Sequence, residues 1–208
     1  MKKGPAHKPG KKAVWPTSEE IACLPWFEEL SQEQIVVIST PEKARRAFEL
    51  LIKEKVVGFD TESKPTFIKG QISQGPHVVQ FATENRAYVF LLQQADCRRI
   101  VGNLIKSSAL KKVGFGLKDD LKRIQSKLHV WPQSVLDLET LFTARGFGRG
   151  VGVKVAVALI FKRRFKKSKK TSTSNWASPF LSPQQIRYAA NDAFAAIKVY
   201  RALSPAKQ

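Results

Sequence analysis

The chain has 208 residues, of which 43% are hydrophobic, and it carries a formal net charge of +19. This length supports one compact domain, and the charge predicts a polyanionic partner, either nucleic acid or an anionic membrane surface. Two isolated cysteines exclude a disulfide framework and favour a reducing, intracellular location, and the longest apolar run, residues 155–161, is too short to span a bilayer, so we expect a soluble protein.

The basic residues are unevenly distributed along the chain. Residues 1–12 hold five lysines and no acid, without the apolar core of a signal peptide, so we expect a disordered basic tail over residues 1–16 and a single domain over 17–208. Seven basic residues lie within nine positions further on: Lys162, Arg163, Arg164, Lys166, Lys167, Lys169 and Lys170. We expect them to attract a phosphate backbone, with a solvated run that makes no fixed contacts as the alternative.

In chain order, the first half of the domain alternates between helix and strand patterns. Thr17 begins a short helix that Pro25 interrupts, and Thr40 is the predicted N-cap of a second helix. Apolar, β-branched runs predict four strands, over residues 34–39, 56–63, 77–83 and 86–92. The last two form a β-hairpin, and the run 56–63 (VVGFDTES) is the buried central strand.

The second half predicts more helix than strand. Helices are expected over 93–107, from about 117 to 128 and from Ser182 to about Leu203, and a strand over 111–115. Residues 136–145 begin a short strand or helix, and residues 153–161 fit either structure by periodicity. Glycine at every second position from 146 to 152 indicates a loop, which is either a place of close phosphate approach or a flexible connector.

Acidic side chains recur on the buried sides of three of these elements. Asp60 and Glu62 project from one face of the central strand, about 7 Å apart at their Cα atoms. They predict a metal site, although two solvated acids at the start of a loop would give the same pattern. Asp120 shares the buried stripe of its helix whereas Asp119 faces outward, and Asp192 lies on the packed, alanine-rich side of the last helix.

Oxygen ligands of this kind suit Mg²⁺ or Mn²⁺ and not zinc. In a protein with a basic flank, such a site favours phosphodiester cleavage by two ions about 4 Å apart. The segments VVGFDTES, KVGFGLKDDL and YAANDAFAAIKVY resemble, in order and separation, the three motifs of the DEDD 3′–5′ exonucleases. The Tyr-x-x-x-Asp form of the last motif is similar to that of the subgroup with ribonuclease D and the Werner syndrome exonuclease domain.

This resemblance implies a ribonuclease H-like α/β fold, a mixed sheet of five to six strands flanked by helices, acting on the 3′ ends of DNA or RNA. It implies that Asp60, Glu62, Asp120 and Asp192 hold two ions, Mg²⁺ or Mn²⁺, and that Tyr188 orients the attacking water. Phe67, in the loop after the first motif, either stacks against a terminal base or packs into the core. The alternatives are a nucleic-acid-binding module without turnover, which predicts a replaced ligand, and a membrane-surface protein, which leaves the inward acids unexplained.

Overall fold

A computed structural model describes residues 15–66, 70–71 and 73–204 of the chain. The expected basic tail up to residue 14 and the loop residue Phe67 lie outside the described residues. The strands are β1 (Ile35–Ile38), β2 (Val56–Glu62), β3 (Val78–Ala82), β4 (Ala87–Leu91), β5 (Lys111–Gly114) and β6 (Val135–Asp137). The α-helices are α1 (Ser18–Cys23), α2 (Pro41–Leu51), α3 (Ala95–Lys106), α4 (Lys118–Leu128), α5 (Glu139–Ala144), α6 (Val153–Phe161), α7 (Lys169–Ser172) and α8 (Pro183–Leu203).

The six strands form one mixed sheet in the order β1-β4-β3-β2-β5-β6. β2, β3 and β4 pair antiparallel in succession, and the other neighbours pair parallel. β2 therefore has a strand on each side and helices over both faces, which explains its nearly continuous apolar run. The mixed sheet flanked by helices confirms the predicted fold class.

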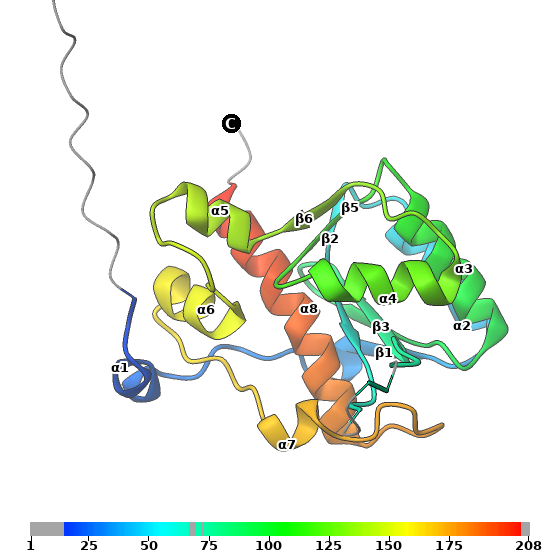
Figure 1. Ribbon diagram of the computed structural model, residues 1–208, viewed down its shortest axis with the longest axis horizontal. Coiled ribbons are helices and arrows are strands. Elements are labelled where there is room, and N and C mark those ends of the chain that lie inside the picture. The colour runs from blue at the N-terminus through cyan, green and yellow to red at the C-terminus, as the bar shows by residue number, and fades with distance from the viewer. Residues whose placement is uncertain (1–14, 67–69, 72, 205–208) are drawn as a thin grey trace, which may run out of the picture.

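Helices cover the two faces of the sheet unequally (Figure 1). α2, α3 and α4 lie over one face, and α8 crosses the other with α6 beside it. Val57 and Phe59 point into the core of the first face, whereas Gly58 faces α8 so closely that a Cβ atom there would collide with the carbonyl oxygen of Ala193. This glycine lets α8 pack directly on β2.

Local sequence explains how α8 begins. The structure also decides between helix and strand in two segments for which the sequence allows either. Ser182 caps α8, and its side chain and that of Gln185 satisfy each other's backbone N–H groups in a capping box. Residues 153–161 form helix α6, which buries Val153, Ala156 and Val157 at helical spacing. Residues 136–145 contain both predicted structures, because strand β6 ends at Asp137 and α5 follows immediately.

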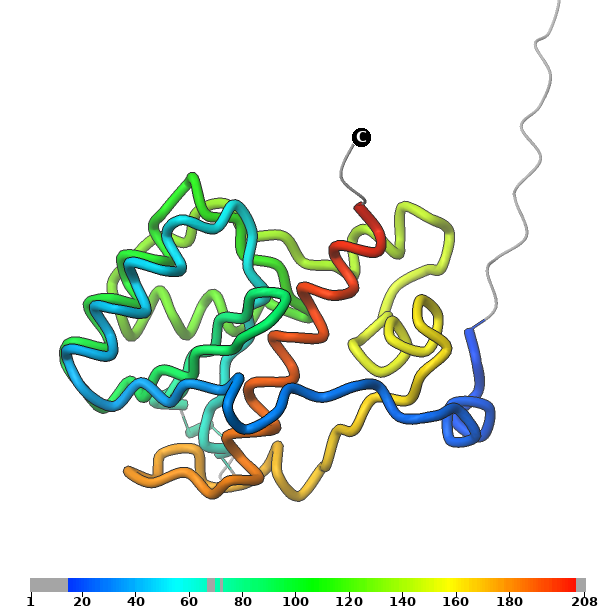
Figure 2. The backbone as a smooth tube through the Cα atoms, turned by 180° about the vertical axis from the view of Figure 1, so that it is seen from behind, coloured from blue at the N-terminus to red at the C-terminus, as the bar shows by residue number. Residues whose placement is uncertain are grey.

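The segment before β1 packs across the α8 side of the molecule (Figure 2). The Trp15 indole N–H donates to the Phe147 carbonyl at 2.6 Å, so described contacts begin one residue before the expected end of the tail. Further along, the Leu30 N–H donates to Asn191 Oδ1 at 2.9 Å, next to Asp192 on α8. Among the described helices, none is long and apolar enough to cross a membrane.

Candidate metal centre

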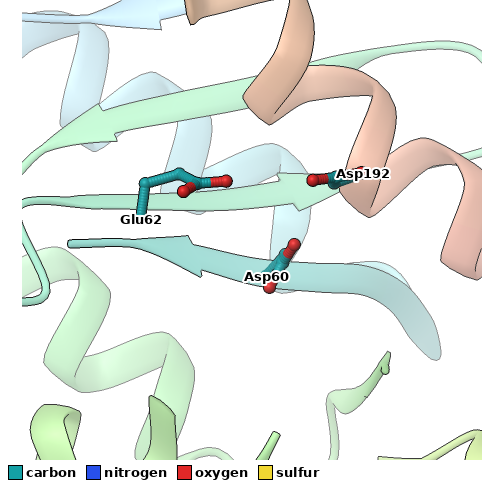
Figure 3. Close-up of side chains that lie close together, drawn as sticks. All are labelled: Asp60, Glu62 and Asp192. Atoms are coloured by element: carbon teal, nitrogen blue, oxygen red, sulfur yellow. The ribbon is translucent and has the colours of Figure 1, made fainter. Parts of the chain in front are cut away.

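Three acidic side chains meet where β2 passes under α8. Asp60 and Glu62 lie two positions apart on β2 and therefore face the same side, and Asp192 comes from the buried side of α8. One carboxylate oxygen from each lies within 4.8 Å of the others. Figure 3 shows the three carboxylate groups directed toward a common point. The predicted arrangement of two acids from the strand and one from the helix is thus present in the structure.

Burial and mutual repulsion act together on these carboxylates. Burial raises the pKa of Asp60 well above its ordinary value, and the negative charge of Asp192 raises it further. Burial likewise raises the pKa of Glu62, with Asp60 as the next contributor. Both effects disfavour the ionised forms unless a cation is nearby. The protein therefore holds negative charge here at a cost that a bound cation would offset.

Asp192 has a cationic partner for only one of its two oxygens. The Lys167 ammonium donates to Asp192 Oδ2 at 2.9 Å, whereas among the described residues no hydrogen bond of acceptable geometry reaches Oδ1. Burial raises the pKa of Asp192, and interactions of its carboxylate with Lys167 and with the Tyr188 side chain, one turn away, help to lower it. A buried carboxylate oxygen without a partner is rare in folded proteins. Because all the donors in the cluster are oxygens, the residues present fit a hard divalent cation such as Mg²⁺ or Mn²⁺.

The fourth predicted acid, Asp120, is not among the three carboxylates that lie together, and its side chain is directed to a different partner. Its Oδ1 accepts a hydrogen bond from Thr61 Oγ1 at 2.6 Å and lies 3.4 Å from the Arg123 guanidinium. Its side chain is 17% exposed, whereas that of Asp119 is 69% exposed and pairs with Lys122. The helical register that directs Asp120 inward and Asp119 outward is confirmed.

Tyr188 lies one helical turn before Asp192 on the same side of α8. Its ring packs against Trp176 with centroids 5.9 Å apart, and the Lys167 ammonium lies 5.5 Å from its centroid. Burial raises the pKa of the Tyr188 hydroxyl, and the charge of Asp192 adds to that shift, so the hydroxyl is a neutral hydrogen-bond donor.

The basic run does not form a uniform solvated strip. Lys167 turns inward to Asp192, and the Arg164 guanidinium stacks 3.7 Å from the centroid of the Trp26 ring while donating to the Ala22 carbonyl. The remaining members of the run are exposed: Lys162, Arg163, Lys166, Lys169 and Lys170. Of the seven basic residues, Lys167 thus lies in the acidic cluster, Arg164 packs on Trp26, and the other five are at the surface.

One pocket of about 280 Å³ is lined by Asp60, Lys167 and Asp192, and a second pocket of about the same volume lies beside Tyr188. The first pocket is also lined by the glycine-rich loop, residues 150–152, and by Phe115 and Glu139. The second contains Tyr188 together with Lys166 and Arg187. Open space therefore lies beside the Lys167–Asp192 pair and, separately, beside Tyr188.

Sequence reasoning missed two contacts of the site. Lys167 was grouped with its basic neighbours, and no local pattern distinguishes it from Lys166, because its partner is 25 residues away. Thr61 was not assigned a role, although its position between Asp60 and Glu62 places its side chain on the opposite face, toward α4.

Comparison with known proteins identifies the family. A family model described as 3′-5′ exonuclease matches residues 35–207. A 3′-5′ exonuclease of Arabidopsis thaliana is 29% identical over 149 residues, which are 71% of this chain and 52% of that protein. The chain thus spans about half the length of this relative.

Solved structures agree on the ribonuclease H-like fold. The Nibbler EXO domain of Aedes aegypti superposes with a TM-score of 0.72 at 22% identity, covering 84% of this chain and 89% of that one. Ribonuclease D of Trypanosoma brucei in complex with RNA U12 gives a TM-score of 0.73 at 19% identity, covering 92% of this chain and 66% of that one. With the family match over most of its length, the chain belongs to the 3′-5′ exonuclease family.

Proposed function

We propose that this chain is a divalent-metal-dependent 3′–5′ exonuclease that removes nucleoside monophosphates from the 3′ end of DNA or RNA. The observation that carries this proposal is the set of three carboxylates within 4.8 Å, with one buried oxygen that lacks a partner among the described residues. Family membership supports the reaction class. The structure of the Trypanosoma brucei ribonuclease D in complex with RNA supports a nucleic-acid substrate.

In this reaction a water oxygen bonds to the terminal phosphodiester phosphorus, the bond to the 3′ oxygen of the preceding nucleotide breaks, and that oxygen gains a proton. Asp60, Glu62, Asp120 and Asp192 would hold two ions, Mg²⁺ or Mn²⁺. When bound, such ions activate water and stabilise the leaving oxygen. Glu62 accepts a proton from the attacking water, and the Tyr188 hydroxyl orients that water by a hydrogen bond.

The exposed basic residues extend the proposal to substrate binding. Lys162, Arg163, Lys166, Lys169 and Lys170 are exposed on the segment that leads to Lys167, and Lys166 and Arg187 line the pocket beside Tyr188. Their charges would attract the sugar-phosphate backbone without reading its sequence. A nucleic-acid-binding module without turnover remains the alternative, although all four acids and the tyrosine of the motifs are present.

The test is digestion of 3′-labelled and 5′-labelled oligonucleotides, as single strands and duplexes of DNA and of RNA, with Mg²⁺, Mn²⁺ or EDTA. We expect metal-dependent release of labelled mononucleotide from the 3′ label and progressive shortening of the 5′-labelled strand. Asp60→Asn should lower the rate by more than about 1,000-fold, because it removes a negative charge at the centre of the cluster. It should leave the protein folded, because it also relieves repulsion.

The matched control is Asp119→Asn, which removes the same charge from an exposed side chain that pairs only with Lys122. This variant should cleave at the wild-type rate, because a surface ion pair of this kind stabilises little. Binding to every oligonucleotide without cleavage under any metal condition would overturn the exonuclease proposal in favour of the binding module.

A further inference from the structure

Lys167 holds a position that differs from that of every other described cation near the cluster. Its ammonium contacts Asp192 Oδ2 at 2.9 Å, its side chain is 33% exposed, and it lines the same pocket as Asp60 and Asp192. Within the described part of the chain, no other Lys or Arg forms an ion pair with Asp60, Glu62 or Asp192. Among the described residues, Lys167 is thus the one cation in direct ion-pair contact with the acidic cluster, whereas Lys154 acts on Asp192 without forming an ion pair.

The backbone that carries Lys167 is fixed on its N-terminal side. Trp26 and Arg164 form a parallel β-bridge, in which the Arg164 N–H donates to the Pro25 carbonyl at 2.8 Å and the Phe27 N–H donates to the Arg164 carbonyl at 2.9 Å. The next residue, Phe165, is buried against Phe27. Residues 164–165 are therefore held by the segment before β1.

It is also fixed on its C-terminal side. Ser168 caps α7 by accepting a hydrogen bond from the Thr171 N–H, and Thr171 is itself buried. A flexible four-carbon side chain between two anchored neighbours can change its partner without any movement of the chain. The part of this segment free to rearrange is therefore the Lys167 side chain itself.

Charge counting indicates when the Lys167 side chain would move. One ammonium faces three carboxylates, and it satisfies Asp192 Oδ2 while Oδ1 keeps no partner among the described residues. A divalent cation bound by the three carboxylates carries more charge and competes with the ammonium for Asp192. A displaced Lys167 would remain tethered at the pocket beside the cluster, where an incoming phosphate is the available anion.

Building on the exonuclease function proposed above, we propose that Lys167 is a positioning residue with two partners. Without metal it pairs with Asp192 and keeps the cluster intact. With metal bound it leaves Asp192 and pairs with a non-bridging oxygen of the scissile phosphate, which it holds in line with the attacking water. Lys167 thereby competes with the metal and assists the reaction.

The test compares wild type with Lys167→Met, which keeps the unbranched apolar stem beside Tyr188 and removes the charge. Mn²⁺ is titrated into each metal-free protein by calorimetry, and single-turnover cleavage is measured at saturating Mn²⁺. We expect Lys167→Met to bind Mn²⁺ about tenfold more tightly and to cleave about 10- to 100-fold more slowly. A merely structural role would weaken both Mn²⁺ binding and cleavage. Tighter Mn²⁺ binding together with slower cleavage therefore identifies the exchange of partners.

The control for metal binding is Lys166→Met, which removes the same charge one position earlier from a side chain that lines the other pocket. Its Mn²⁺ affinity should equal that of wild type. A wild-type protein that cleaves, together with a Lys167→Met variant whose Mn²⁺ affinity or single-turnover rate is unchanged, would overturn this inference alone. Absence of both Mn²⁺ binding and cleavage in wild type would overturn the proposed function as well.

Discussion

Two buried charged groups lie on opposite faces of the sheet, and the protein treats them differently. On the α3 side, Lys112 is fully buried, and its ammonium donates to the carbonyls of Leu104, Ser107 and Leu110 at 3.2, 2.7 and 2.8 Å. On the α8 side, three carboxylates share the single ammonium of Lys167. Each of the three N–H groups of Lys112 has a hydrogen-bond acceptor, whereas one ammonium does not balance the negative charge of three carboxylates.

The comparison shows that burial of charge by itself does not mark a functional site. Burial lowers the pKa of Lys112 to about 8 and raises the pKa of Asp60 well above its ordinary value, so both environments favour the neutral form. Only on the α8 side does a buried polar atom, Asp192 Oδ1, lack a hydrogen-bond partner among the described residues of the two sites. An unmet requirement for a cation therefore distinguishes a binding site from a structural contact.

The largest effect is expected from a change that separates α8 from β2. Gly58→Ala would place a Cβ atom against the backbone of Ala193, next to Asp192, and backbone atoms cannot yield as a flexible side chain does. We expect the free energy of unfolding to fall by at least about 4 kcal/mol and the melting temperature by roughly 10 °C. Thermal denaturation followed by circular dichroism measures this.

The control lies on the opposite face, in α3. At Gly102 a Cβ atom would meet only Val130 Cγ1, at an ordinary 3.5 Å, and alanine favours a helix by about 1 kcal/mol over glycine. Gly102→Ala should therefore keep or raise the melting temperature. Equal destabilisation by the two substitutions would show that the close contact between Gly58 and α8 is not the cause of the loss of stability.

A smaller, pH-dependent effect is expected at Lys112. Its pKa in the folded protein, about 8, is below the ordinary lysine value of 10.5, so the unfolded state retains the proton more strongly. Stability contributed by this group therefore rises as the pH increases from about 8 toward 10.5. Between pH 7 and pH 10, the stability of wild type relative to Lys112→Met should increase by roughly 2 to 3 kcal/mol.

Denaturant unfolding of both proteins at the two pH values measures this difference, and titration of the other lysines cancels between them. A difference that does not change with pH would mean that the three carbonyl acceptors keep the ammonium charged throughout. Lys112 would then stay charged over this pH range, as Lys167 does in its ion pair with Asp192.

The smallest effect is expected from removing one hydroxyl beside the cluster. Tyr188→Phe keeps the ring that packs on Trp176, so stability should change by less than about 1 kcal/mol. We expect the cleavage rate to fall about 10- to 100-fold, because the hydroxyl orients the attacking water, while Mn²⁺ affinity stays at the wild-type value. Single-turnover kinetics with calorimetric titration separate these properties, and an unchanged rate would assign Tyr188 to packing alone.

Much of the candidate site could be predicted because it depends on local periodicity. The alternation of a strand places Asp60 and Glu62 on one face, and the register of a helix distinguishes Asp120 from Asp119. The partner of Lys167 could not be predicted in this way. Its choice of Asp192 over solvent depends on the path of residues 162–168, which is set by contacts with the distant segment before β1.

The sequence by itself determined most of the helices and strands, the cap of α8 and the faces on which the acids lie, because these follow from side-chain spacing and backbone preference within a few residues. Only the tertiary structure decided that residues 153–161 form a helix, that Thr61 binds Asp120 and that Lys167 enters the acidic cluster. These outcomes depend on which distant surfaces meet once the sheet has assembled. Spacing along the chain does not encode such contacts, because they arise from packing between elements that are far apart in sequence.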